Sequence, residues 1–543
     1  MIEVNKERDI NCLPVSYITN KYTPGGIFVE LMKRNIHMDC LKCKASTQIT
    51  LEDDINISDS RPDAYKLIMD RGNVVIEEVK VTDDHVNVKG CLVFKILYLT
   101  EEEKADVAGM EGRVPFEELL YMEGIENGDQ VNVEWDIEDL TVGLINSRKF
   151  SVQSLIMLNV FCEEIHDEET AVDLVSSEPV EFRKKTLDIA AMTICKKDIF
   201  RIKEEVEMPG SFPNIFSLIW WDITPANVEF KMLSEKIGIQ GEIKAFFIYR
   251  GEGEDEICHY ETTLPFSGTI DCPGAEEGMI SEIRYHAEVK EAVVRPDFDG
   301  EERVITFEMC LNLDINAYGE EQLSILSDVY GVVKEISVQE REASFKKLLG
   351  KSSGKLKLSE HFAPEGQVQI VKVLHAAGKV QIVDTALAEN GIEVTGTVNL
   401  QVLYESAGDE KYGMLKENIP FQYVLEAEGV TKDCIYRMQV NAEQLTVSVI
   451  NGNEIDVKCV LLFSSNIYRK WKEKIVEKVT ASELDAQKMS ELPGIAVYMV
   501  RDGESLWDIG KRYYVPVSTL MQTNQLACEE VKAGDRILIV KSS

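Results

Sequence analysis

Apolar and polar residues alternate with period two along three stretches of the chain, 86–98, 237–249 and 392–404. Such alternation puts every second side chain on one face, as in a β-strand that covers a core. The three stretches share one phase, with a glycine on the apolar face and a tyrosine eight residues later. They therefore predict long strands that are copies of one unit. The pairs are Gly90 and Tyr98, Gly241 and Tyr249, and Gly396 and Tyr404.

Further landmarks repeat around these strands. A Pro-Phe pair follows each tyrosine after 16 or 17 residues, and two more strand-like runs come after it. Pro62 and Pro213 precede the first two glycines by 28 residues, whereas Val368 stands at that place in the third copy. Many strands, polar turns and few helical periods indicate antiparallel β-sandwiches. We interpret the strand glycine as a bend, bulge or close-packing device, because glycine otherwise weakens a strand.

Corresponding landmarks of the copies lie about 150 residues apart, so each copy is long enough to form a hydrophobic core of its own. We expect an N-terminal segment at 1–35 and repeats at 36–165, 183–340 and 341–468. Segments 163–182 and 347–367 are acidic or poorly patterned and are predicted connectors. Segment 469–494 is charged and helix-compatible, and we expect a linker there.

Residues 495–541 have a different pattern, which predicts the order β-α-α-β. A short alternating strand ends near Val500, and Asp502 with Gly503 forms a turn signal. Ser505 followed by Asp508 predicts a helix cap. Pro516 predicts the start of a second helix, and the run AGDRILIV predicts a closing strand.

Charge narrows the classes of partner. The chain has 95 acidic and 58 basic residues and a net charge of −37, spread along its length. Such a field repels phosphate backbones and anionic membranes. The N-terminus mixes charges of both signs without the apolar run of a signal peptide, and no stretch of about 18 apolar residues occurs. We therefore expect a cytoplasmic protein without nucleic-acid binding or membrane insertion.

The sequence contains few candidates for a metal, phosphate-binding or catalytic site. Cys40 and Cys43 have the spacing of one half of a zinc site, but no second pair or His cluster follows at the expected distance. We therefore favour structural cysteines and leave metal binding open. The run GKSSGK at 350–355 lacks the spacing and the Ser or Thr of a phosphate loop. The seven histidines do not pair at helical spacing. We expect no enzyme, no cofactor, no metal and no catalytic residue.

The C-terminal motif YMVRDGESLWDIGKRYY…STLMQTNQL…VKAGDRILIV resembles a LysM domain. It departs from the family at Tyr514, usually glycine, and at Ala533, often proline. The resemblance implies an N-acetylglucosamine groove between 502–507 and 526–531. Trp507 either packs against the linker or second helix, or forms a partly exposed anchor. The residues implied to bind a partner or glycan are Asp502, Gly503, Glu504, Ser505, Leu506, Trp507, Asn524 and Leu526.

The repeats together with this module resemble SipL-type spore-coat morphogenesis proteins, whose β-units are SPOCS domains. The implied fold is mainly β, with three SPOCS sandwiches and a LysM domain. The implied role is an adaptor in spore coat and exosporium assembly, made in the mother cell and docked at the forespore surface on the coat-basement ATPase SpoIVA. The alternative is a peptidoglycan-binding protein of the cortex or cell wall. Oligomeric state and the roles of single repeats stay open.

Overall fold

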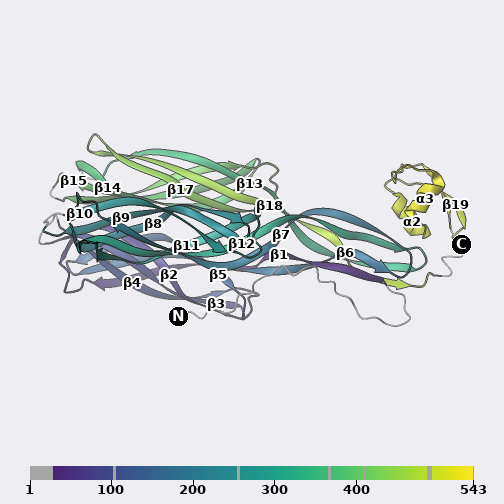
Figure 1. Ribbon diagram of the computed structural model, residues 1–543, viewed down its shortest axis with the longest axis horizontal. Coiled ribbons are helices and arrows are strands. Elements are labelled where there is room, and N and C mark those ends of the chain that lie inside the picture. Colours follow the sequence, from purple (N-terminus) through teal and green to yellow (C-terminus); the bar gives the residue numbers. More distant parts are fainter. Residues whose placement is uncertain are drawn as a thin grey trace.

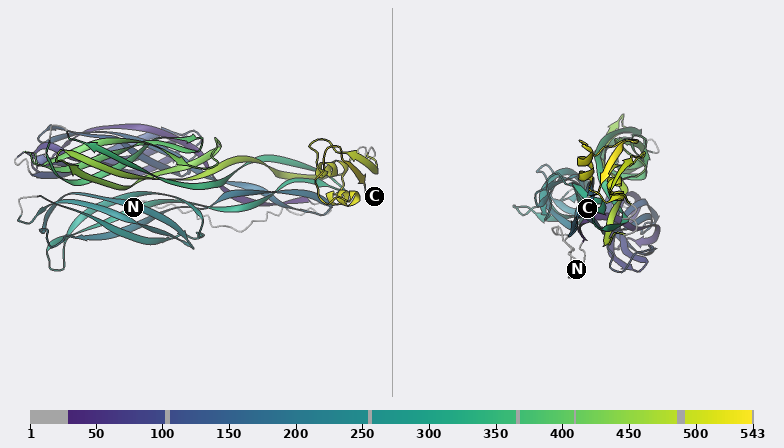
Figure 2. Two further views of the ribbon diagram at one scale, coloured as in Figure 1. Left: turned by 90° about the horizontal axis from the view of Figure 1, so that it is seen from above. Right: turned by 90° about the vertical axis from the view of Figure 1, so that its right-hand side faces the viewer.

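The computed structural model describes residues 29–101, 106–253, 257–364, 368–408, 410–485 and 492–541. Three β-domains lie side by side and form a broad head (Figure 1). A narrow β-stalk leaves one end of the head and leads to a small α/β module. Seen end-on, the three domains form three lobes around the long axis (Figure 2). The molecule is therefore a rod with the head at one end and the module at the other.

Each domain consists of six strands in two antiparallel three-stranded sheets, which confirms the predicted β-sandwich. The first domain contains β1 (Val29–Asn56), β2 (Ala64–Thr82), β3 (His85–Thr100), β4 (Val107–Tyr121), β5 (Val131–Asn146) and β6 (Lys149–Ser176). The second contains β7 (Val180–Glu207), β8 (Ile215–Leu233), β9 (Lys236–Gly251), β10 (Ile257–Asp271), β11 (Ile280–Pro296) and β12 (Glu302–Gly331). The third contains β13 (Glu335–Phe362), β14 (Ile370–Ala388), β15 (Gly391–Ser406), β16 (Tyr412–Glu426), β17 (Cys434–Ile450) and β18 (Glu454–Ser482).

One sheet of each domain has a long strand at its centre, and the other sheet has the alternating strand there. The sheet orders are β1-β6-β5 and β2-β3-β4 in the first domain, β7-β12-β11 and β8-β9-β10 in the second, and β13-β18-β17 and β14-β15-β16 in the third. Each pair of sheets encloses a separate apolar core. The repeat unit is therefore a complete folding unit with its own core.

The strand glycine is a packing device in all three domains, as predicted. It lies directly opposite the phenylalanine of the Pro-Phe pair, as in Gly90 and Phe116. A Cβ on Gly90 would stand 2.8 Å from that ring and 2.6 Å from the carbonyl oxygen of Val75. The neighbouring strand shifts register at this point, between Ile76 and Glu78. The glycine therefore makes room for an aromatic ring on one side and a bulge on the other.

The repeated tyrosine is buried in each core and ties down the start of the domain in two of them. The hydroxyl of Tyr98 donates to the carbonyl of Pro62 at 3.0 Å, and that of Tyr249 donates to Pro213 at 3.4 Å. These prolines are the two upstream landmarks of the sequence. Two positions 36 residues apart thus form one recurring contact.

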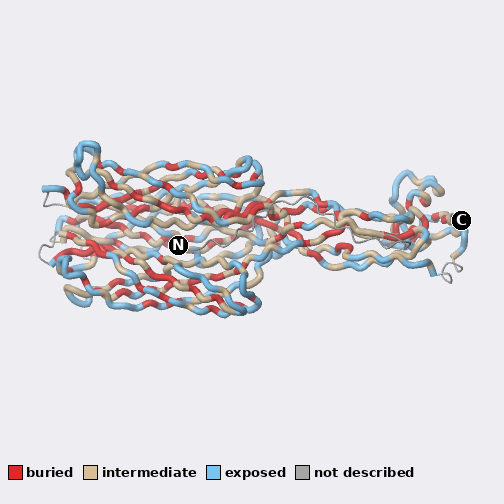
Figure 3. The backbone as a smooth tube through the Cα atoms, turned by 60° about the horizontal axis from the view of Figure 1, so that its bottom comes forward, coloured by how far each residue is buried: buried red, intermediate tan, exposed pale blue. Residues whose placement is uncertain are grey.

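The stalk consists of three antiparallel ribbons, one from each domain: β1 with β6, β7 with β12, and β13 with β18. These strands have 28 to 30 residues and span about 90 Å at roughly 3.3 Å per residue, so they continue far beyond the sandwiches. Buried residues from all three ribbons form two apolar clusters, and Figure 3 shows buried positions along the stalk. The stalk therefore has a thin apolar core of its own, formed by all three domains.

The predicted connectors and linker are wrong in this region. Residues 163–176 and 180–182 belong to the stalk parts of β6 and β7. Residues 347–362, with the GKSSGK run, belong to the part of β13 that packs on the core of the third sandwich. Residues 469–482 form the end of β18 and not a helix-compatible linker. The stalk is so narrow that few positions face inward, and charged side chains cover the rest. The alternation is therefore too weak to indicate strands.

A buried ion pair marks the junction of head and stalk. Lys346 of β13 is only 4 % exposed and pairs with Asp39 of β1. Its ammonium lies 3.9 Å from the ring centroid of Tyr318 and 4.8 Å from that of Tyr468. Burial lowers the pKa of Lys346, although Asp39 opposes this shift. One lysine thus contacts groups from all three domains.

Candidate functional site

The C-terminal module contains β19 (Ile495–Met499), α2 (Leu506–Tyr513), α3 (Val517–Asn524) and β20 (Arg536–Val540), in the predicted order. The predicted cap of α2 is confirmed: the Ser505 side chain accepts the Asp508 amide, and Asp508 accepts the Ser505 amide at 2.8 Å. Gly503 has φ +78°, as the turn before the helix requires. The start of α2 is thus determined by local sequence.

The module has its own apolar core. Leu506, predicted as a site residue, is fully buried there. Leu526 is partly buried against the same core. Two backbone hydrogen bonds join the module's loops, from Val500 to the Asp535 carbonyl and from Gly534 to the Val500 carbonyl, each 2.9 Å long. The segments 502–507 and 526–531 therefore belong to one rigid unit.

Two further predicted site residues hold the module together. Asn524 donates to the carbonyls of Leu520 and Leu538 at 2.8 Å and accepts the Leu538 amide at 2.7 Å, which locks α3 to β20. Glu504 accepts the Tyr498 hydroxyl at 2.7 Å and pairs with Arg512 at 2.8 Å. The Tyr498 hydrogen bond and the Arg512 charge lower the pKa of Glu504 to about 2. Both side chains are thus engaged inside the module.

Trp507 lies in one apolar cluster with Val517 and Leu520 of α3, and it also packs against the stalk, a contact that the sequence did not suggest. Its side chain is 5 % exposed, and its indole nitrogen donates to Asp328 of β12 at 2.7 Å. The Tyr330 ring stands edge-on at 4.7 Å between centroids. The Arg183 guanidinium lies 4.8 Å from the indole ring. Sequence reasoning identified the residue but could not identify these partners.

An exposed apolar face remains on the module. Ile495, Val497 and Met499 alternate along β19 and are all largely exposed, with Val497 at 66 %. In the described chain β19 pairs only with β20, so its other edge is unpaired. Asp502 and Gly503 are exposed next to this strand, and Ser505 is half-buried. Apolar side chains on a free strand are typical of a protein-docking surface.

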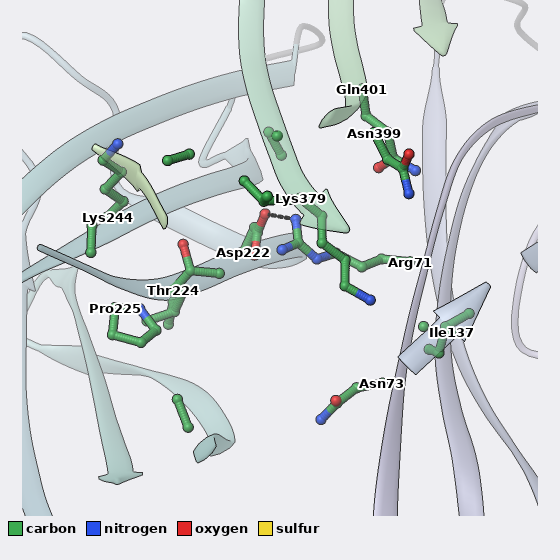
Figure 4. A pocket seen from close by; sticks show the side chains of 18 of the residues that line it. Arg71, Asn73, Ile137, Asp222, Thr224, Pro225, Lys244, Lys379, Asn399 and Gln401 are labelled. Atoms are coloured by element: carbon green, nitrogen blue, oxygen red, sulfur yellow. Dashed lines mark hydrogen bonds and ion pairs between the residues drawn. The ribbon is translucent and has the colours of Figure 1, made fainter. Parts of the chain in front are cut away.

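A second feature, which the sequence did not indicate, is a cavity of about 1900 Å³ between the three sandwiches (Figure 4). Asp222 of the second domain is 8 % exposed and faces this cavity. It binds Arg71 of the first domain and lies 3.3 Å from His375 of the third. The apolar cluster at the contact of the three domains contains Leu99, Phe246 and Leu403. These contacts hold the head together.

The charges of this cluster support one another. Burial by itself would raise the pKa of Asp222, but Arg71 and His375 outweigh it and lower that pKa. Burial opposes protonation of His375, but its hydrogen bonds to Asp222 and Glu261 raise its pKa. Lys95 lies over the Trp221 ring, and burial lowers its pKa to about 8. Because these partners come from different domains, the cluster is best explained as an interdomain joint.

The cysteines have ordinary surroundings. Cys40 is exposed, whereas Cys43 is half-buried opposite Cys162 on the neighbouring strand. Within the residues that the structure describes, no group of three or more His, Cys, Asp or Glu side chains is placed to share a metal ion. Over the same residues, no helix has the length and apolar content to cross a membrane.

Comparison with known proteins identifies both kinds of domain. The family model described as SipL, SPOCS domain matches residues 63–145, 214–294 and 369–450, one match in each sandwich. The LysM domain model matches residues 498–540. No curated protein and no solved structure matches the chain. The chain therefore has the domain content of a SipL-type protein, with three SPOCS domains on a shared stalk and a C-terminal LysM domain, which are binding domains and not catalytic ones.

Proposed function

We propose that this protein is a non-enzymatic adaptor in spore coat and exosporium assembly, and that the LysM module docks it on the coat-basement ATPase SpoIVA at the forespore surface. The domain content supports a sporulation-related scaffold with a module of a peptidoglycan-binding type. The observation that favours a protein partner is the exposed apolar face of Ile495, Val497 and Met499 on β19. Sugars are bound through polar groups and aromatic rings, whereas this face offers aliphatic side chains and a free strand edge.

The shape of the molecule suits an adaptor. The module and the SPOCS head lie at opposite ends of the stalk, so the two ends can bind different partners at the same time (Figure 2). The module is less acidic than the rest of the chain, because its basic and acidic residues balance. A protein partner therefore meets least repulsion at this end. Under this proposal the protein works in the mother-cell cytoplasm and stays in the coat.

The deciding experiment compares two valine-to-aspartate variants. Val497→Asp puts a charge on the β19 face, and Val383→Asp makes the same change at an equally exposed valine on β14 of the head, with 66 % and 70 % exposure. Capture of the ATPase by immobilised protein should fall at least tenfold for Val497→Asp and stay unchanged for Val383→Asp. Equal capture by both variants contradicts docking through β19.

The alternative is a peptidoglycan-binding protein of the cortex or cell wall, which the LysM match favours. Co-sedimentation with insoluble peptidoglycan, run beside ATPase capture, separates the two. The adaptor proposal predicts ATPase capture without sedimentation. Sedimentation with peptidoglycan and no capture of the ATPase supports the alternative instead.

A further inference from the structure

We propose that the groove of the LysM module holds a protein ligand that belongs to the chain itself, namely the tip of the stalk. The tip is formed by Arg183 of β7, Asp328 and Tyr330 of β12, and Glu335 of β13. The groove implied by the LysM resemblance lies between 502–507 and 526–531. Stalk residues contact both of these segments. This inference does not depend on the proposed coat ATPase, because it concerns a different face of the module from β19.

Arg183 contacts both walls of the groove. Its guanidinium lies 4.8 Å from the ring centroid of Trp507, on the first wall. It also pairs with Glu529 on the second wall, with 3.6 Å between nitrogen and oxygen. A side chain that reaches both walls takes the place that a bound ligand needs.

Tyr330 contacts the module beside the groove, at the end of α2, and is part of the module's apolar core. It is 2 % exposed, and its hydroxyl donates to the carbonyl of Val515 at 2.9 Å. Gly510 of α2 leaves the room for it, since a Cβ there would stand 2.6 Å from the tyrosine hydroxyl oxygen. The module thus has a space beside Gly510 that the Tyr330 side chain fills.

Asp328 brings a negative charge next to α2 of the module. It accepts the Trp507 indole at 2.7 Å and the Lys511 ammonium at 2.6 Å and 2.8 Å. A hydrogen bond to a charged acceptor is stronger than one between neutral groups. The indole that could stack on a sugar is therefore already satisfied by the stalk.

The departure of Tyr514 from the LysM pattern fits the same contact. This residue ends α2 in the left-handed region, at φ 57° and ψ 39°, which explains why glycine is usual there. A residue with a Cβ atom is strained in this region, because the Cβ comes close to the backbone. Its hydroxyl binds Glu335 of the stalk, and burial together with that bond raises the pKa of Tyr514 to about 12. The side chain that replaces glycine thus serves the docked arrangement.

The stalk and a glycan therefore compete for one groove. The double variant Asp328→Ala/Tyr330→Ala removes the deepest contacts. Arg183→Ala removes only a partly exposed side chain, so it cannot upset a core. Glu321→Ala is the control, because this acidic residue lies on the same strand β12 but pairs with Arg34 instead of the module.

Two measurements on the full chain test the proposal. Hydrogen–deuterium exchange of peptides covering 505–515 should rise at least tenfold in the double variant, with unchanged exchange in the sandwiches. Calorimetric titration with penta-N-acetylglucosamine should show at least tenfold tighter binding by the double variant than by Glu321→Ala. Arg183→Ala should shift both readouts in the same direction by a smaller factor.

Several results overturn the proposal. Exchange in 505–515 that matches the control shows that the stalk does not hold the module. Sugar affinity that matches the control shows that the stalk does not fill the groove, whether both proteins bind or neither does. A wild-type dimer that becomes a monomer in the double variant, measured by light scattering, assigns the groove to the stalk of a second copy. Val497→Asp should change neither readout, so failure here and failure of ATPase docking are distinguishable.

Discussion

Replacing Gly396 with alanine tests the contact between strand glycine and phenylalanine that recurs in every domain. Gly396 lies in β15, the central strand of its sheet, opposite Phe421. An added Cβ would stand 2.4 Å from the carbonyl oxygen of Gln381 and 2.6 Å from the nearest atom of the Phe421 ring. Both distances lie well below contact, and a backbone carbonyl in a sheet cannot swing aside. The bulge between Ile382 and Asp384 and the buried ring must both move.

The expected cost follows from this overlap. Forcing an extra methyl group into a packed core costs typically about 1–3 kcal/mol, and the upper half of that range applies because one of the obstructing groups is backbone. For a domain of this size about 2–3 kcal/mol lowers the melting temperature by roughly 5–10 °C. Scanning calorimetry would show this as a downward shift of the transition that contains the third domain.

The other glycines supply a ranking and a control. In Gly90→Ala the nearest backbone oxygen is 2.6 Å away, and in Gly241→Ala it is 3.2 Å away, so the loss of stability should decrease from Gly396 to Gly90 to Gly241. Gly350 on β13 has no atom within 4 Å of its Cβ position, and Gly350→Ala should change stability by less than about 0.5 kcal/mol. The reasoning is refuted if Gly396→Ala and Gly350→Ala melt at the same temperature.

Three further outcomes are expected. Because the folded pKa of His375 is raised above its unfolded value of about 6.5, its stabilising charge is present below that pH and lost as pH rises through the folded pKa. Wild type should therefore melt above His375→Gln at pH 6, and an equal gap at pH 9 would contradict this. Lys346→Met removes the charged partner of the half-buried Asp39, which keeps the Tyr318 hydroxyl as a donor, and should cost about 3 kcal/mol in urea unfolding, the lower end of the range for a buried pair. Most of this should be regained in the double variant with Asp39→Leu. Glu504 has a depressed pKa of about 2, so it stabilises the module above about pH 4.3 and that contribution is lost as pH falls to about 2. Near-ultraviolet circular dichroism should find Glu504→Gln less stable than wild type at pH 6 but not at pH 2.

The parts of the fold that depend on local pattern could be predicted from the sequence. Period-two alternation with the glycine, tyrosine and Pro-Phe landmarks predicted three sandwiches, because a strand in a two-layer domain buries every second residue. The cap at Ser505 and the turn at Gly503 predicted the start of α2, because each contact lies within a few residues. In both cases the residues that carry the signal lie close in sequence to the element that they predict.

The contacts between these units could not be predicted from the sequence and are known from the three-dimensional arrangement alone. Most of the acidic segment 163–182, predicted to be a connector, forms stalk strands, because a thin core shared by three ribbons needs few inward side chains and leaves no clear alternation. Arg71 meets Asp222 across 151 residues of sequence, and Trp507 meets Asp328 across 179. The residue type indicated that Trp507 makes a binding contact. Its partner depends on how three separate domains combine into one stalk. Local periodicity shows which face of a strand or helix is buried, but it does not show which part of the chain packs against that face.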